Sequence, residues 1–499
     1  MTESAPRPPL SEPAVERLSA LDRALRIVAD VRPGEGLTAL GLATALFLLL
    51  LAYYIIKPVR EALILQHPAG AEYKSWMGAG IALLLLFVVP AYSKLAERLP
   101  RNRLVSGVTL FFASHLVLFY WASSTPGVRS SLWLGLGFFL WVGIFNMLLV
   151  AQLWAFANDL YDQEQGRRLF AIVGVGASIG AIAGGAIKNA LESVFDLFQM
   201  LLVSAVALGG VALIVQLLHR RELAAASARR AQALARAAAA QPGPADALLA
   251  PPAAERRLEP GGAFAILRQH RYLSLIAAFS LVFTLVNTNG EYLLGKLIKA
   301  DASAAIAAGR LAPDQIADFI AGKYNDFFQW MNGLGFVLQL FVVSRLIKRV
   351  GAGPSFFILP VIALGNALSI SIVPVLGVLF VGKVIENSTD YSLNNTLRQM
   401  LWLPTTREMK YKAKQAVDTF FVRMGDVASG GWVALAISVL GLGVRGFAFG
   451  NAVLVGIWLW LAVAIVRAQG ALAAAGPLTG APTAGASSPP ASAQGTPAT

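Results

Sequence analysis

Repeated long apolar segments constrain the fold of this chain more than any other feature. A helix crosses the hydrocarbon core of a bilayer with about 17 to 25 predominantly apolar residues. Segments of this length and character recur along the sequence and predict twelve membrane-spanning helices. They lie at residues 37–56, 75–92, 104–121, 131–156, 170–190, 197–217, 271–295, 325–346, 354–373, 376–396, 415–440 and 446–467.

The composition agrees with an integral membrane protein. Hydrophobic residues make up 56% of the 499 positions and charged residues 14%, whereas a soluble domain has about a quarter charged residues. The chain has no cysteine and four widely separated histidines, which excludes disulfides and thiolate chemistry and argues against a metal centre. We therefore predict no enzyme, no metal site and no cofactor.

The order of the segments predicts two six-helix bundles, at 37–217 and 271–467. A polar segment, 1–36, with an amphipathic helix at 13–30, precedes them, and a segment at 218–270, rich in Ala, Arg and Pro, is predicted to be a flexible cytoplasmic linker. The uncharged tail, 468–499, is predicted to be disordered.

The positions of the basic residues predict the orientation. Lys and Arg concentrate in segments that lie on one side if the N-terminus is cytoplasmic, as the positive-inside rule requires. Both termini are then cytoplasmic, and the net charge of +13 reflects membrane topology rather than binding to nucleic acid.

Two basic loops suggest an internal repeat. Ser93-Lys94-Leu95-x-x-Arg98 matches Ser344-Arg345-Leu346-x-x-Arg349 after an interval of 251 residues (344 − 93). Glu164-x-Gly166-Arg167-Arg168 is similarly followed, 244 residues later (408 − 164), by Glu408-x-Lys410-x-Lys412. Two parallel six-helix units around a site at the membrane midplane are typical of the major facilitator type of transporter. The predicted fold class is therefore an all-α polytopic membrane protein with two pseudo-repeats.

Polar residues inside the predicted spans mark a candidate site. In span 376–396, Lys383, Asn387, Asp390 and Asn394 are spaced by four, three and four residues, which puts them on one face of an α-helix. Charged groups at this depth are costly and must face protein or water, so the stripe is predicted to line a cavity. Arg423 and Asp426 in the next span are predicted to face it. The alternative is that Lys383 pairs with Asp390, and Arg423 with Asp426, for structural reasons only.

Other spans carry further candidates, each with a simpler interpretation. Lys57 and Arg60 near the end of the first span are three residues apart and suit an anion, but they also fit side chains that extend to the interface. Glu291 in span seven is either a gating or coupling residue or a partner of Lys296. Small residues at every fourth position permit close helix packing, and the fifth span has them at Gly176, Gly180 and Gly184.

Four stretches resemble the ATP/ADP translocase family of bacteria and plastids. They are Ile56 to Glu61, Leu153 to Asp159 with Gly166 to Phe170, Asn287 to Leu297, and Lys410 to Asp418. The resemblance implies twelve helices and nucleotide exchange. It maps the family's basic residue of span one to Arg60, its span-seven glutamate to Glu291, and its basic residue near span eleven to Lys412 or Lys414. The family's span-four glutamate has no counterpart, since an uncharged residue stands near Val142.

These observations predict a monomeric secondary transporter in a bacterial inner membrane that exchanges nucleotides, or another phosphorylated anion, by alternating access. A proton-coupled permease and a non-transporting membrane scaffold are the alternatives. The predicted substrate-binding residues are Lys57, Arg60, Glu291, Lys383, Asn387, Asp390, Asn394, Lys412, Lys414 and Arg423. The predicted coupling or gating residues are Glu291, Asp418 and Asp426.

Overall fold

A computed structural model describes residues 19–27, 29–125, 127–161, 163–239, 263–405, 409 and 413–475. Throughout this part of the chain the regular structure is helical. Eleven of its helices are long and apolar enough to cross a membrane. The predicted class of an all-helical polytopic protein is confirmed.

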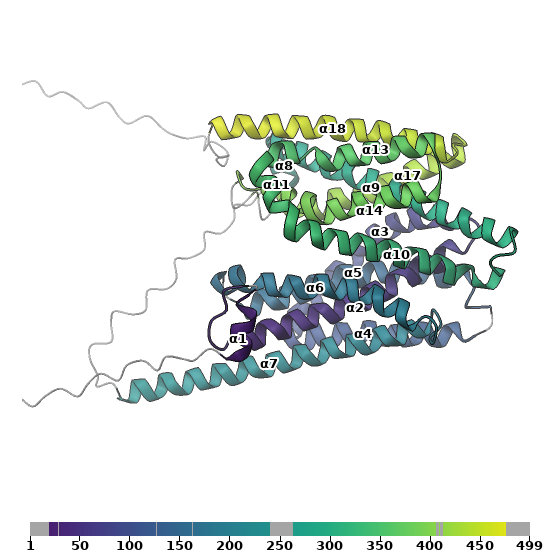
Figure 1. The fold of residues 1–499 in the computed structure, drawn as a ribbon. Coiled ribbons are helices and arrows are strands. Elements are labelled where there is room, and N and C mark those ends of the chain that lie inside the picture. The colour runs from purple at the N-terminus through teal and green to yellow at the C-terminus, as the bar shows by residue number, and fades with distance from the viewer. Residues whose placement is uncertain are drawn as a thin grey trace, which may run out of the picture.

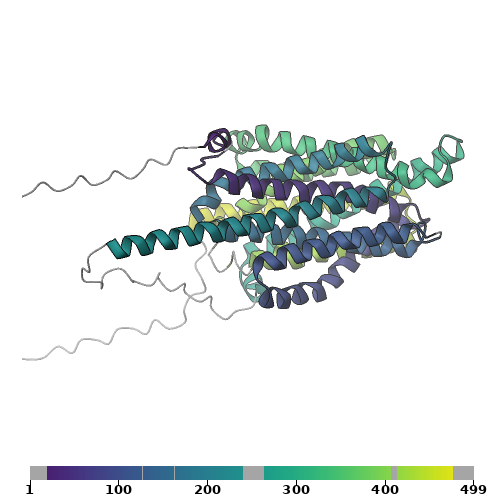
Figure 2. The ribbon, with the colours of Figure 1, turned by 90° about the horizontal axis from the view of Figure 1, so that it is seen from below.

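The N-terminal half is a bundle of long helices (Figure 1). Its helices are α1 (Ala20–Leu25), α2 (Gly36–Leu65), α3 (Gly70–Arg98), α4 (Arg101–Ser123), α5 (Leu132–Leu160), α6 (Gln163–Leu191) and α7 (Gln199–Ala239). Figures 1 and 2 both show α7 projecting beyond the rest of the bundle.

The C-terminal half has the same general plan, with more interruptions. Its α-helices are α8 (Ala263–Gln269), α9 (Arg271–Ala307), α10 (Ile316–Val337), α11 (Val343–Val350), α12 (Ala352–Ser355), α13 (Ile358–Ile372), α14 (Leu376–Thr389), α15 (Asn395–Met400), α16 (Lys414–Ala416), α17 (Val422–Val433) and α18 (Val444–Ala475). A 3-10 turn, η1 (Pro313–Gln315), precedes α10. Wider π-helical turns join neighbouring segments at η2 (Leu338–Val342), η3 (Asp390–Asn394), η5 (Val417–Phe421) and η6 (Ala434–Val439).

Both halves share two membrane faces. The terminal face is the one where α2 begins and α18 ends, on the left in Figure 1, and the distal face is opposite. The first long helix of each half is the most buried, with 67% of the α2 span and 61% of the α9 span inside the protein. The second span of each half is the least buried, at 11% for both α3 and residues 313–350. The repeated basic motif ends these two spans, as an internal repeat requires.

The glycines of α6 lie against the backbone of α2. A Cβ atom built on Gly176, Gly180 or Gly184 would come within 2.3, 2.2 or 2.6 Å of the carbonyl oxygens of Ala43, Phe47 and Leu51. Any larger side chain at these positions would force the helices apart. This geometry fits the packing role predicted from the four-residue spacing.

The count of twelve spans is not confirmed by helix length and composition. The predicted tenth span corresponds to α14, η3 and α15, a nearly continuous helical run from Leu376 to Met400. It does not qualify among the eleven because Lys383, Glu386 and Asp390 fall within it. A twelfth crossing here therefore stays a prediction.

Three predictions of irregular or amphipathic segments need correction. Helix α7 continues to Ala239 and α8 covers 263–269, so those parts of the predicted flexible linker are helical. Helix α18 continues to Ala475, eight residues into the predicted tail. Ala, Arg and Leu are strong helix formers, which explains these extensions. Of the predicted helix at 13–30, only Ala20–Leu25 is helical in the described residues. Residues 13–18, 240–262 and 476–499 lie outside them.

The start of α2 is fixed by carboxylates on the terminal face. The Asp22 carboxylate accepts hydrogen bonds from the backbone N–H groups of Ser19, Gly34 and Gly36. Glu35 pairs with Arg168 of α6 at 2.8 Å. Burial raises the pKa of Glu35, but hydrogen bonds from Arg168 and from the backbone N–H of Arg32 outweigh it, so the pKa lies below its usual value.

Candidate functional site

A polar cavity of about 250 Å³ lies between the two halves. Helices α2, α3 and α5 form one wall, and α9, α10, α14, η3 and α17 form the other. The lining residues are Tyr53, Lys57, Arg60, Glu61, Lys74, Ser75, Gly78, Ile81, Phe139, Asn287, Thr288, Glu291, Tyr292, Phe328, Asn387, Asp390, Tyr391, Arg423 and Asp426. Seven of the predicted site residues meet here.

Lys74 of α3 is the centre of the charged network. Its Nζ atom lies 2.7 Å from Glu61 Oε2 and 3.7 Å from Glu291 Oε2, and donates a hydrogen bond to Tyr324 OH at 3.1 Å. Glu61 also pairs with its neighbour Arg60. Because Glu61 belongs to the N-terminal half and Glu291 to the C-terminal half, one ammonium group joins both halves.

Lys57 has different surroundings. Its Nζ atom lies 3.9 Å from the ring centre of Phe328 and 5.3 and 5.7 Å from those of Tyr54 and Tyr53. None of the ion pairs within the described residues includes Lys57. The alternative that Lys57 and Arg60 extend to the interface is wrong, because both side chains line the cavity between the halves. An aromatic cage stabilises the ammonium while leaving it without a carboxylate partner.

Lys383 does not line the cavity as predicted. Its side chain is fully buried and pairs with Glu386 at 2.9 Å, and it donates a hydrogen bond to Asn287 Oδ1 at 2.9 Å. The expected partner, Asp390, instead accepts a hydrogen bond from Asn394 at 2.8 Å. Neither Lys383 nor Asn394 belongs to the lining. The predicted stripe is wrong at both ends. At Asn394 the π-helical turn η3 breaks the 3.6-residue period, whereas Lys383 lies in the regular helix α14 and is directed to Glu386 and Asn287.

Arg423 and Asp426 form the pair that the simpler interpretation foresaw. Arg423 Nη1 lies 2.8 Å from Asp426 Oδ2, and Thr288 donates a hydrogen bond to the other carboxylate oxygen at 3.0 Å. Both charged residues nevertheless line the cavity. Asp426 is therefore held by one residue on its own helix and one on α9.

Glu291 is not the partner of Lys296. It accepts a hydrogen bond from Asn387 Nδ2 at 2.9 Å and faces Lys74, whereas Lys296 pairs with Glu72 of α3. Glu291 thus lies on the cavity surface, between groups of both halves.

The predicted residues before α17 are not part of the cavity. Lys414 and Asp418 pair with each other at 2.7 Å, and Arg398 lies 3.5 Å from Asp418. None of these three lines the cavity. Lys412 lies outside the described residues. Lys188, a further cation that could have joined the site, pairs with Glu192 elsewhere in the protein.

The cavity wall is formally neutral. It carries four cationic and four carboxylate side chains, and 4 − 4 = 0. These are Lys57, Arg60, Lys74 and Arg423 against Glu61, Glu291, Asp390 and Asp426. The carboxylates thus compensate the cations that were predicted to bind an anion.

The cavity is closed toward the distal face. Glu72 of α3 accepts a hydrogen bond from Tyr292 at 2.9 Å and pairs with Lys296 at 3.3 Å. Lys299 of α9 donates a hydrogen bond to the carbonyl oxygen of Pro68 at 2.6 Å, and Asn325 of α10 donates one to Gly185 at 3.0 Å. These contacts join the halves between the cavity and the distal side.

Toward the terminal face the halves are separated by a second cavity of about 410 Å³. Its walls include Leu50 and Tyr54 of α2 and Asn332 and Gln339 on the facing side. Tyr391 lines both cavities. Among the described residues, the two ion pairs between the halves, Lys74–Glu291 and Glu72–Lys296, lie at the central cavity or on its distal side. Within the part of the chain that the structure describes, ion pairs therefore join the halves at the central cavity and on its distal side, but not on the terminal side.

Several cavity residues escaped the sequence analysis. Lys74 was missed because the second span was placed at 75–92, whereas α3 begins at Gly70. Glu61 is the last residue of the stretch Ile56 to Glu61 and directly follows Arg60. This position next to a predicted site residue could have identified it. The aromatic residues Tyr53 and Phe328 carry no signal that distinguishes a cavity wall from lipid-facing sequence.

A comparison with protein families decides the membership. The model of the family described as TLC ATP/ADP transporter matches residues 138–468, about two thirds of the chain, including the cavity wall that the C-terminal half contributes. This chain belongs to the TLC ATP/ADP transporter family. Its relatives by sequence include ADP,ATP carrier protein 1 of Chlamydia trachomatis, which is 22% identical over 432 residues covering 75% of this chain and 77% of the relative. The protein of the same name from Chlamydia muridarum is 21% identical over the same shares.

Solved structures show the fold of this TLC family member. The nucleoside transporter NupG is 13% identical, with a TM-score of 0.54 over 86% of this chain and 99% of that one. A bacterial homologue of the human lysosomal transporter Spinster is also 13% identical, with a TM-score of 0.53 over 87% and 98% of the two chains. At these identities the likeness concerns architecture alone, and it confirms a fold of the major facilitator type.

Proposed function

We propose that this protein exchanges nucleotides of the ATP/ADP type across a bacterial inner membrane by alternating access. The observation that carries the proposal is the cavity between the halves, with four cationic side chains, in a chain of the TLC ATP/ADP transporter family. Adenine nucleotides are also what the names of the chlamydial relatives specify. Membership of a transporter family argues against the scaffold alternative.

Lys57 is the first contact for the phosphates in this proposal. A nucleotide polyphosphate is stable in a low-dielectric cavity only with several converging cations. Among the described residues Lys57 has no carboxylate partner to displace, so binding a phosphate there costs less than at Arg60 or Lys74. The nearby rings of Tyr53, Phe328 and Tyr391 offer flat surfaces for a base.

The carboxylates explain why such a carrier would exchange one nucleotide for another rather than transport a nucleotide in one direction and return empty. Without substrate, Lys74 is neutralised by Glu61 and Glu291 and holds the two halves together. Phosphates that enter the cavity compete with Glu291 for Lys74 and weaken this link between the halves. The distal side then opens only when a polyanion replaces the carboxylate, which makes the movement of the empty carrier unfavourable.

The orientation follows from the same proposal. The terminal face is cytoplasmic, with both termini on that side, as the basic residues predict. The described conformation is then open toward the cytoplasm through the second cavity. The working unit is a monomer, since both walls of the cavity come from one chain.

Proton coupling is the second candidate, and Asp390 favours it. Its side chain lines the cavity, and among the ion pairs of the described residues none includes it. A carboxylate so placed is a candidate for reversible protonation. In that case a protonophore would abolish uptake regardless of the solute inside the vesicle.

Uptake by proteoliposomes tests the proposal. Vesicles preloaded with ADP should accumulate labelled ATP, and empty vesicles should not. Arg60→Ala should abolish this exchange while the protein still inserts and folds. Equal uptake by loaded and empty vesicles would contradict exchange, and uptake that competing nucleotides leave unchanged would contradict the substrate class.

A further inference from the structure

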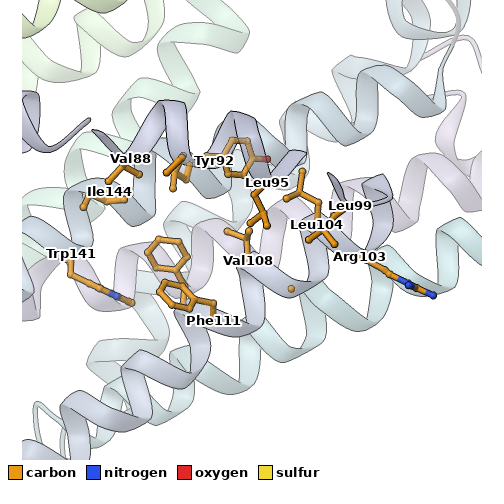
Figure 3. A pocket seen from close by; sticks show the side chains of 14 residues that line it. Val88, Tyr92, Leu95, Leu99, Arg103, Leu104, Val108, Phe111, Trp141 and Ile144 are labelled. Atoms are coloured by element: carbon orange, nitrogen blue, oxygen red, sulfur yellow. The ribbon is translucent and has the colours of Figure 1, made fainter. Parts of the chain in front are cut away.

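A third cavity lies outside the transport path, between α3, α4 and α5. It measures about 510 Å³ and shares no lining residue with the central cavity. Figure 3 shows its apolar side chains, which include Val88, Leu95, Val108, Phe111 and Ile144. Leu95 and Phe111 are 41% and 55% exposed. On a membrane-spanning bundle, such exposed apolar residues face lipid tails, so this groove is open to the bilayer.

One end of the groove is basic. Arg103, two residues after the start of α4, lines the groove, and Figure 3 shows its guanidinium group directed away from the apolar side chains. Lys94 and Arg98 lie in the last turns of α3, at the same terminal face. All three are exposed, and none of the ion pairs within the described residues includes them.

The neighbouring Arg101 shows that these free cations are not a general property of the loop. Arg101 lies 3.3 Å from Asp159 and 2.9 Å from Glu222, so its charge is compensated. Arg103 on the groove, with Lys94 and Arg98 in the last turns of α3, leaves three positive charges at the terminal end of the helices that form the groove. This combination matches the chemistry of a phospholipid, which has an anionic phosphate next to a long hydrocarbon chain.

We propose that the groove binds an anionic glycerophospholipid of the surrounding membrane. One acyl chain packs between α3, α4 and α5 as far as Phe111 and Ile144. The headgroup lies at the terminal face, where Arg103 binds the phosphate through its planar fork of donors and Lys94 and Arg98 add attraction. Basic pockets between helices on the cytoplasmic side are suited to anionic headgroups.

The proposal gives a role to one copy of the repeated motif. Lys94 and Arg98 are the basic residues of Ser93-Lys94-Leu95-x-x-Arg98. Helix α3, which forms one wall of the groove, also carries Lys74 and packs through Gly78 and Ser75 against α17 of the other half. A lipid in the groove would thus support, from the membrane side, the helix that joins the two halves.

Gly107 provides a variant that blocks the groove without disturbing the fold. It lines the groove, and a Cβ atom built on it meets nothing within 4 Å. Gly107→Leu should therefore fill the space of the acyl chain. Gly137→Leu is the matched control, because Gly137 on α5 also has nothing within 4 Å and does not line the groove.

Further variants test the binding of the headgroup. A triple variant, Lys94→Gln, Arg98→Gln and Arg103→Gln, removes the three cations, and Arg103→Gln alone removes the cation that lines the groove. Arg345→Gln with Arg349→Gln removes the equivalent basic residues from the other copy of the motif, whose positions do not line the groove. This control separates a local site from a general loss of positive charge.

The experiment measures lipid retained by the purified full chain in a neutral detergent without nucleotide. The probes are phosphatidylglycerol, phosphatidylcholine and inorganic phosphate, with native mass spectrometry and the thermal unfolding midpoint as readouts. We expect one retained phosphatidylglycerol, a raised midpoint, and at least a tenfold preference over phosphatidylcholine. Arg103→Gln should lower the preference about fivefold, since a basic residue near anionic lipid contributes about that factor.

The remaining outcomes decide the proposal. Gly107→Leu should lose the retained lipid and the rise in midpoint, while Gly137→Leu and the Arg345/Arg349 variant keep both. Equal retention of phosphatidylcholine, an equal effect of inorganic phosphate alone, or full retention by Gly107→Leu would overturn it. Because no nucleotide is present, the result is independent of the proposed transport activity.

Discussion

The two faces of the seam between the halves differ in how they are held. On the distal side, Glu72, Lys296 and Tyr292 form a polar link, and Lys74 joins Glu61 to Glu291 at the cavity itself. On the terminal side, a cavity of about 410 Å³ separates the same halves. The difference indicates that ion pairs between the halves keep this seam closed. A polyanion can compete for the cations of these pairs and so weaken the closure.

Removal of the central cation should have the largest effect. Lys74→Met leaves the buried Glu61 without its lysine partner and removes the link to Glu291. Loss of one partner of a buried pair costs about 3–5 kcal/mol, so the thermal midpoint should fall strongly and exchange should stop. Lys296→Met is the matched control on the partly exposed pair and should cost less than about 1 kcal/mol.

A second variant keeps this prediction testable if Lys74→Met does not fold. Lys74→Met combined with Glu291→Gln removes the carboxylate that has lost its lysine, while Glu61 keeps its pair with Arg60; this double variant should restore most of the midpoint, but not the exchange. Equal midpoints for Lys74→Met and Lys296→Met would show that the cavity network does not hold the seam.

Lys57 should separate binding from stability. Lys57→Gln removes a cation that has no ion-pair partner in the described residues, so the thermal midpoint should change little. The KM for ATP should rise about 10- to 100-fold, because a hydrogen bond to a charged group contributes about 1.5–3 kcal/mol. Uptake kinetics in ADP-loaded vesicles measure the rise, with Lys57→Arg as the control that keeps the charge. An unchanged KM would remove Lys57 from the site.

The distal link should have a moderate effect on the conformation. The side chains of Glu72 and Lys296 are 20% and 32% exposed, and such a pair contributes about 0.2–1 kcal/mol. Glu72→Gln should thus shift the balance toward the distally open state by up to about fivefold. Labelling of a cysteine introduced in the cavity by a membrane-impermeant reagent measures this shift. The charge exchange of Glu72→Lys with Lys296→Glu should reverse it, and unchanged labelling would contradict the role of the link.

The smallest effect should come from pH at the terminal end of α2. The pKa of Glu35 is lowered in the folded protein by hydrogen bonds from Arg168 and Arg32. Its contribution is complete above the unfolded value of about 4.5 and is lost as the pH falls through the lower folded value. The thermal midpoint of the natural protein should therefore fall in this acidic range, and the midpoint of Glu35→Gln should fall less. Parallel curves for the two proteins would contradict the assignment.

The sequence predicted the helices well, because the cost of placing polar backbone in lipid leaves few alternatives for long apolar segments. It failed where polar residues interrupt or begin a span. Glu72 and Lys74 resemble a loop by hydropathy, although α3 begins at Gly70. The Ala- and Arg-rich continuation of α7 was predicted to be flexible from its composition, although these residues favour helix.

The sequence predicted which residues meet at the candidate site better than it predicted which ion pairs they form. Glu291, Asn387, Asp390, Arg423 and Asp426 meet in one cavity with residues of the first span. Helical periodicity predicted all of these except Glu291, which was predicted from its charge within a span and from the family resemblance. The π-helical turn at Asp390–Asn394 changes the period. Pairs across more than 200 residues, such as Lys74 with Glu291, leave no pattern in a single sequence.

Distances between spin labels across the seam test the central claim most directly. The chain has no cysteine, so introduced pairs at Ser124 and Ala312 on the distal side, and at Glu97 and Lys348 on the terminal side, label without interference. On addition of ATP or ADP, the account predicts a population with a longer distal distance and a shorter terminal distance, and no such change with adenosine. Distances that stay the same with and without nucleotide would contradict a charge-held seam that a polyanion opens.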